Sequence, residues 1–62
     1  MEYQASIKNI TRGTYLRSEN HGEIRYTKDA DKRLIFYDKD DAEDILAMIE
    51  DCSSDCYTLC LE

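Results

Sequence analysis

The chain has 62 residues, no proline and a formal net charge of −6, from 14 acids against eight Lys and Arg side chains. A chain of this length buries only about 60% of its unfolded surface, so we expect one marginally stable domain over residues 1–62. The acidic balance argues against direct nucleic-acid binding, because domains with that function are typically basic. No apolar stretch is long enough to cross a bilayer, so no membrane association is expected.

Three short strands are predicted in the first half of the chain. Apolar and polar side chains alternate along residues 3–10, a period of two that is typical of a half-buried strand. Residues 14–17, which carry Tyr15 and Leu16, predict a second strand, and residues 23–27, which alternate again, predict a third. The intervening turns, around Gly13 and over residues 18–22, are short enough for hairpins. These segments together predict a three-stranded antiparallel meander.

The segment 38–51 predicts the main helix, over residues 39–51. Asp38 is the expected cap, because its carboxylate can accept hydrogen bonds from backbone N–H groups that the first turn leaves unpaired. Apolar side chains recur at helical spacing and form one stripe, which should be buried against the sheet and its connections. The stripe consists of Ala42, Ile45, Leu46 and Ile49, and the expected partners are Ile7, Tyr26, Phe36 and Leu59.

A connection and a last strand complete the predicted fold. Residues 27–29 can cap a single helical turn over residues 30–33, and the apolar segment 34–37 then leads into the main helix, either directly or through a short strand. Residues 56–61 alternate again and predict a closing strand. The expected fold class is α+β, an antiparallel sheet of three or four strands with one packed helix in the order β-β-β-α-β.

The arrangement of these motifs resembles that of small bacteriophage and prophage proteins. The shared features are a Tyr-Thr-x-Asp turn at residues 26–29, the aromatic Phe36 after a short helical turn, and a helix capped by Asp38 with Ala42 in its first turns. The resemblance covers about residues 3–50, not the cysteine-containing tail, and implies a fold of this type and a phage or prophage origin. Its motifs are structural signals and carry over no catalytic residue, and most such proteins have no assigned activity.

The cysteines are the candidates for a metal site. Cys52, Cys56 and Cys60, with His21, could in principle provide four zinc ligands. On a strand, however, Cys56 and Cys60 would lie about 13 Å apart, too far to share one ion. We therefore expect no metal and no cofactor, and reduced thiols in a cytoplasmic protein without a secretory signal. No nucleophile pattern surrounds His21, so no enzymatic activity is expected.

Charge is distributed unevenly along the chain. Residues 1–37 carry seven Lys and Arg against five acids, whereas residues 38–62 carry nine acids and only Lys39. Carboxylates along a helix can imitate the phosphate row of a nucleic acid. This predicts a protein-binding module that inhibits or modulates a host or phage nucleic-acid-handling protein; the alternative is that the acids form only a solvated helix face. The predicted contacts are Asp40, Asp41, Glu43, Asp44, Glu50 and Asp51.

A competing prediction rests on the basic half of the chain. An aromatic side chain beside arginines on a sheet can bind single-stranded nucleic acid by stacking on its bases. The residues that would make such a surface are Arg12, Tyr15, Arg17 and Arg25.

A homodimer is also predicted, because an isolated core of this size is marginal. The last strand, with Tyr57, Leu59 and Leu61, could offer its edge to a second copy. Such a dimer could alternatively pair the basic half of one copy with the acidic half of the other.

Overall fold

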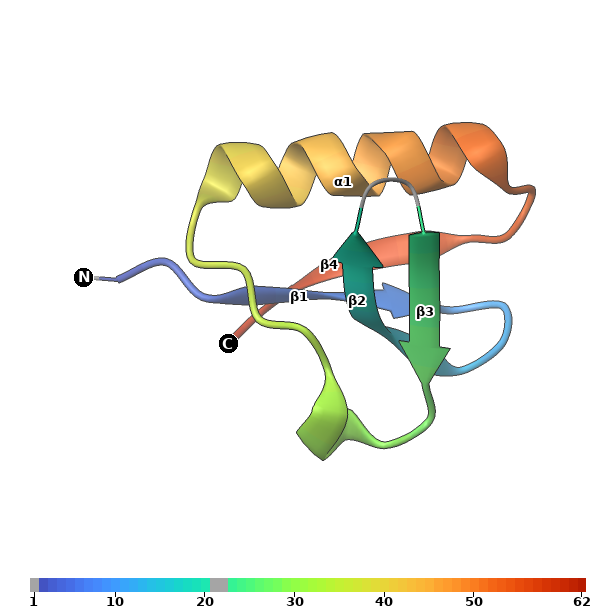
Figure 1. The fold of residues 1–62 in the computed structure, drawn as a ribbon, viewed down its shortest axis with the longest axis horizontal. Coiled ribbons are helices and arrows are strands. Elements are labelled where there is room, and N and C mark those ends of the chain that lie inside the picture. The colour runs from blue at the N-terminus through green and yellow to red at the C-terminus, as the bar shows by residue number, and fades with distance from the viewer. Residues whose placement is uncertain (1, 21–22) are drawn as a thin grey trace.

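The computed structural model describes residues 2–20 and 23–62 as a four-stranded antiparallel sheet packed with a single helix (Figure 1). In chain order, the elements are β1 (Ala5–Asn9), β2 (Thr14–Asn20), β3 (Glu23–Thr27), the 3-10 turn η1 (Ala30–Lys32), α1 (Lys39–Cys52) and β4 (Tyr57–Leu61). The strand order is β3-β2-β1-β4, so the last strand returns to pair with the first. The predicted α+β fold class and the β-β-β-α-β order are confirmed.

The sheet divides into two strand pairs that run across each other in Figure 1, with β1 and β4 along α1 and the β2–β3 hairpin in front of them. β1 pairs with all five residues of β4, but only its own last two residues, Lys8 and Asn9, pair with β2. The segment before α1 fills the resulting gap: Leu34 donates to the Leu16 carbonyl at 2.8 Å, and Ala5 and Phe36 exchange hydrogen bonds of 3.0 and 2.7 Å. This segment therefore forms an isolated bridge rather than a strand.

β2 is longer than predicted. The predicted polar turn over residues 18–22 is wrong for residues 18–20, which pair with β3 from Ser18 opposite Arg25 to Asn20 opposite Glu23. Their polar side chains suggested a turn, but cross-strand pairing overrides such weak preferences. A register shift between Leu16 and Ser18 marks an irregularity in this hairpin. Residues 21 and 22 lie outside the described residues.

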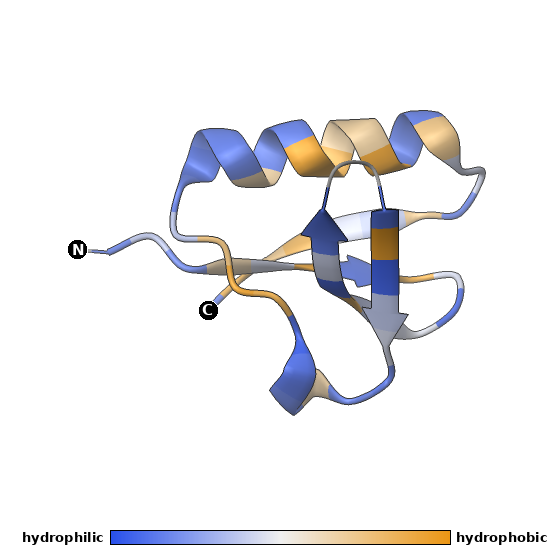
Figure 2. Ribbon diagram, viewed as in Figure 1, coloured by the Kyte–Doolittle hydropathy of each residue, from blue (hydrophilic) through white to orange (hydrophobic). Residues whose placement is uncertain are grey.

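α1 begins at the predicted cap. The Asp38 carboxylate accepts hydrogen bonds from the N–H groups two and three residues later, at 2.8 and 3.4 Å. Of the predicted apolar stripe, Ala42 and Ile49 are buried, and Ile45 and Leu46 are half-buried. Hydrophobic residues accordingly gather in the middle of α1 (Figure 2).

The core joins three elements. Ile7 of β1, Leu16 of β2 and Ile49 of α1 form its buried cluster, and Ala5 and Ala42 are fully buried as well. Tyr26, which was expected in this core, is instead 38% exposed. It lies on the edge strand β3, where a cleft separates it from the last turn of α1. The partly buried residues around the core are Ile24, Leu34, Phe36, Ile45, Leu46, Tyr57 and Leu59.

Candidate functional site

The six carboxylates predicted as partner contacts are all exposed on α1. Asp40, Glu43 and Asp44 are three or four residues apart and so share one side of the helix, with Asp51 further along it. From Asp40 to Asp51 the row is about 16 Å long, at about 1.5 Å per residue. Within residues 2–20 and 23–62, no ion pair involves any of these six acids. We call this surface the acidic face: Asp40, Asp41, Glu43, Asp44, Glu50 and Asp51.

Two apolar side chains interrupt the acidic face. Ala47 is exposed and Met48 is half-buried. Together with Asp44, Glu50 and Asp51 they line a shallow hollow on the outer side of α1. An adaptable methionine among charged groups is a combination suited to contact with another protein, because the thioether side chain packs against varied shapes.

A second hollow lies where α1 approaches β2. Its volume is about 420 Å³, and it is lined by Phe36 and Ile45 together with the acids Glu19, Asp41 and Asp44. The acidic face therefore borders apolar surface on this side as well.

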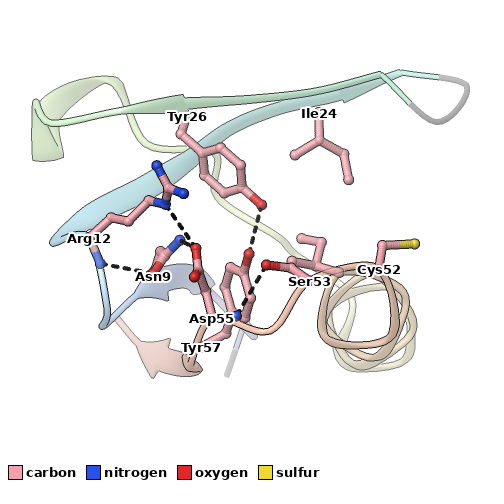
Figure 3. A pocket seen from close by; sticks show the side chains of 9 residues that line it. Asn9, Arg12, Ile24, Tyr26, Cys52, Ser53, Asp55 and Tyr57 are labelled. Atoms are coloured by element: carbon pink, nitrogen blue, oxygen red, sulfur yellow. Dashed lines mark hydrogen bonds and ion pairs between the residues drawn. The ribbon is translucent and has the colours of Figure 1, made fainter.

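A cleft of about 340 Å³, here called the tyrosine cleft, opens between the last turn of α1 and the β2–β3 hairpin (Figure 3). The Tyr26 and Tyr57 rings stack with their centroids 6.5 Å apart, and their hydroxyl oxygens are 3.4 Å apart. Burial and this hydrogen bond raise the pKa of Tyr26 above its ordinary value. The lining residues are Asn9, Arg12, Ile24, Tyr26, Ile49, Cys52, Ser53, Asp55 and Tyr57.

The charged groups of the tyrosine cleft neutralise one another. The Asp55 carboxylate accepts hydrogen bonds from the Asn9 amide at 3.1 Å and from the Arg12 guanidinium at 2.9 Å. The backbone N–H of Arg12 donates to the Asn9 side-chain oxygen at 3.1 Å. These bonds, that from Asn9 first, hold the pKa of Asp55 below its ordinary value. The network therefore fastens the β1–β2 turn to the turn before β4.

Of the residues of the nucleic-acid alternative, Arg12 lies apart from Tyr15, on the other face of the sheet. Arg12 and Arg25 each pair with a carboxylate of the protein, at 2.9 and 2.6 Å. The Lys8 ammonium lies over the Tyr15 ring, 5.7 Å from the ring centroid. Lys8 and Tyr15 are cross-strand partners and therefore share one face of the sheet. Asn9, the neighbour of Lys8 in β1, lines the tyrosine cleft together with Arg12, so Lys8 and Tyr15 lie on the opposite face. Arg17 is exposed on β2.

The cysteines do not converge. Cys52 and Cys56 are exposed, and Cys60 is half-buried in β4. Among residues 2–20 and 23–62, no group of three or more His, Cys, Asp and Glu side chains could hold a metal ion. His21, the fourth ligand of the zinc alternative, lies outside the described residues. In the same described part, no helix is long and apolar enough to span a membrane.

The tyrosine cleft was not predicted from the sequence. Its side chains come from β1, β3, β4, the end of α1 and two turns, so no local sequence motif predicts it. The available signal was the alternation in residues 23–27, which puts Ile24 and Tyr26 on one side of their strand.

Comparison of the chain with protein-family models, with curated proteins and with solved structures finds no match. Function must therefore be inferred from the surfaces themselves. Of these, the acidic face carries charge that the described part of the chain leaves without an ionic partner, whereas the charged groups of the tyrosine cleft pair with each other.

Proposed function

We propose that the protein is a binding module whose acidic face docks in a basic groove of a nucleic-acid-handling protein and inhibits or modulates it. One observation carries the proposal: all six carboxylates are exposed, and none is ion-paired within residues 2–20 and 23–62. Such carboxylates keep their charge available to cations of a partner, and complementary charge steers and orients protein association.

The density of charge on α1 supports a phosphate-like role. One strand of duplex DNA carries a phosphate about every 3.4 Å along its axis, or about five over 16 Å. Six carboxylates lie around α1 over a similar length, and four of them, Asp40, Glu43, Asp44 and Asp51, lie along one side of the helix. A groove lined with Lys and Arg for phosphates would therefore meet a comparable amount of negative charge.

The acids are also held in place before binding. The Asp38 cap fixes the first turn, and the buried Ala42 and Ile49 fix the helix to the sheet. A rigid helix spends less free energy on ordering when it binds. Ala47 and Met48 add a small apolar centre to a charged rim, a composition found in protein interfaces.

The alternative function, binding of nucleic acid through the basic strands, has less support. Arg12 and Arg25 already pair with carboxylates, and the chain carries a net charge of −6 that would repel DNA. The resemblance to small bacteriophage proteins makes a bacterial or phage protein in the cytoplasm the expected partner, and that origin stays a prediction.

Affinity capture from bacterial lysate at low and high salt tests the proposal. The variant Asp40→Asn/Asp44→Asn removes two charges from the acidic face, and the control Glu2→Gln/Asp31→Asn removes two exposed charges elsewhere. At about 0.2–1 kcal/mol per exposed pair, the first variant should weaken capture about 2- to 30-fold. High salt should weaken capture too, whereas the control should match the wild type.

Two outcomes would count against this function. One is a captured protein whose retention ignores both salt and the Asp40/Asp44 substitutions. The other is retention of short DNA or RNA in a gel-shift assay, weakened by Arg17→Ala, which would favour the basic-surface alternative.

A further inference from the structure

β4 forms an outer edge of the sheet, with β1 on its inner side. The pairing is bracketed by two backbone hydrogen bonds: Ile10 donates to the Cys56 carbonyl at 2.8 Å, and Glu62 donates to the Gln4 carbonyl at 2.9 Å. In an antiparallel ladder, successive residues turn their N–H and C=O groups alternately toward and away from the neighbour. The backbone N–H and C=O groups of residues 56, 58, 60 and 62 therefore point toward β1.

The intervening residues of β4 face outward. By the same alternation, Tyr57, Leu59 and Leu61 direct their backbone N–H and C=O groups to the outer edge, and within the described residues no strand pairs there. The hydrogen bonds of β1 agree with this alternation. Ala5 is opposite Leu61, yet it makes its backbone hydrogen bonds to Phe36, on the side of β1 away from β4.

This edge lacks the usual protection against pairing. Natural edge strands are shielded by charged residues, proline or bulges. β4, with the sequence YTLCL, has no charged residue and no proline, and its register with β1 is regular. The other edge strand, β3, carries Glu23 and Arg25 and pairs through a register shift. Leu61 is 73% exposed at the end of the unprotected edge.

We propose that β4 pairs with β4 of a second copy, antiparallel about a two-fold axis at Leu59, so that one sheet runs through both subunits. With the axis at Leu59, all five residues of β4 overlap. Leu59 then pairs with its own symmetry mate and Tyr57 pairs with Leu61 of the partner subunit, each pair exchanging backbone hydrogen bonds. A second copy fits because the outward residues form a symmetric apolar series, as a two-fold interface requires.

Charge distinguishes this dimer from the alternative in which the basic half of one copy meets the acidic half of the other. β4 is uncharged, and each copy carries a net charge of −6, so like charge opposes association through this edge. Added salt screens that repulsion and should strengthen the dimer. The acidic face takes no part in the pairing, so the inference does not depend on the proposed function.

Sedimentation combined with amide hydrogen exchange tests the pairing on the wild-type protein. From low to hundreds of micromolar, the protein should pass from monomer to dimer. Over the same range, the amides of Tyr57, Leu59 and Leu61 should become protected, while those of Thr58 and Cys60 are protected throughout. A monomer at every concentration, a dimer without new protection at residues 57, 59 and 61, or a dimer weakened by salt would overturn the proposal.

A pair of lysine substitutions localises the interface. Leu61→Lys places a charge on the proposed edge and should raise the dimer dissociation constant about tenfold or more. Ile10→Lys, at an isoleucine that is 55% exposed outside β4, should leave it unchanged. Protection of Thr58 and Cys60 in the Leu61→Lys protein verifies that it is folded, and equal dissociation constants for both variants would contradict the β4 interface.

Discussion

Replacing Ile49 with alanine tests the core most sharply. Ile49 is 1% exposed, packs with Ile7 and Leu16, and also lines the tyrosine cleft. The substitution removes three carbon groups, at about 0.8 kcal/mol each, which gives about 2.4 kcal/mol of lost transfer free energy. A residual cavity normally adds to this cost. Because the vacated space joins an open cleft, we expect a total of only about 2.5–3 kcal/mol.

That loss is large for a chain of this size. At about 0.05–0.15 kcal/mol per residue, the free energy of unfolding is about 3–9 kcal/mol. Thermal unfolding followed by circular dichroism should therefore show a midpoint lowered by about 20 °C. Protein concentration must be held fixed, because the proposed dimerisation would make the midpoint depend on it.

Ile10→Ala is the matched control for Ile49→Ala. Ile10 is the same residue type but is 55% exposed, so its truncation should change the free energy of unfolding by no more than about 0.5 kcal/mol. If Ile49→Ala unfolds at the same temperature as Ile10→Ala and the wild type, the assignment of Ile49 to the core is wrong.

Three further predictions concern the cap, the carboxyl groups and the cysteines. Asp38→Ala should lower the free energy of unfolding in urea by about 1 kcal/mol, because two backbone N–H groups lose their acceptor. Asp51→Ala, in the last turn of α1, should not lower it, and equal losses for the two variants would contradict the cap. Stability should fall as the pH drops below about 4, because hydrogen bonds hold the pKa of Asp55 and Glu62 below their ordinary values in the folded state, so the unfolded chain takes up protons first. Asp55→Asn should make this acid loss shallower, and an unchanged pH profile would count against the Asp55 network. A chelator should leave the unfolding midpoint of the reduced protein unchanged, and tightly bound zinc at one ion per chain would contradict this.

Much of the fold was predictable because its signals are local. The Asp38 cap and the apolar stripe locate α1 to within a residue at its end, and alternation locates β1, β3 and β4. The sequence predicts a turn at residues 18–20 because all three are polar, and because serine and asparagine favour turns. Their place in β2 is decided by pairing with β3, which no short window of sequence contains.

The surfaces divide in the same way. The exposure of the acidic face was predictable, and the spacing of Asp40, Glu43, Asp44 and Asp51 places these four on one side of the helix. The tyrosine cleft was not, because the stacking of Tyr26 on Tyr57 and the contact of Asn9 with Asp55 join residues 31 and 46 positions apart. The exposure of Tyr26 follows from the position of β3 at the edge of the sheet, which depends on β4 returning to β1.

Competition with DNA is the most direct measurement of whether the acidic face stands in for a row of phosphates. The partner protein captured from lysate is first bound to a fluorescently labelled form of the 62-residue chain. Short duplex DNA is then added in increasing amounts. If the acidic face occupies a phosphate-binding groove, DNA displaces the chain completely, and Asp40→Asn/Asp44→Asn is displaced at lower DNA concentrations than Glu2→Gln/Asp31→Asn. Simultaneous binding of DNA and the chain to the captured protein would contradict the proposed function.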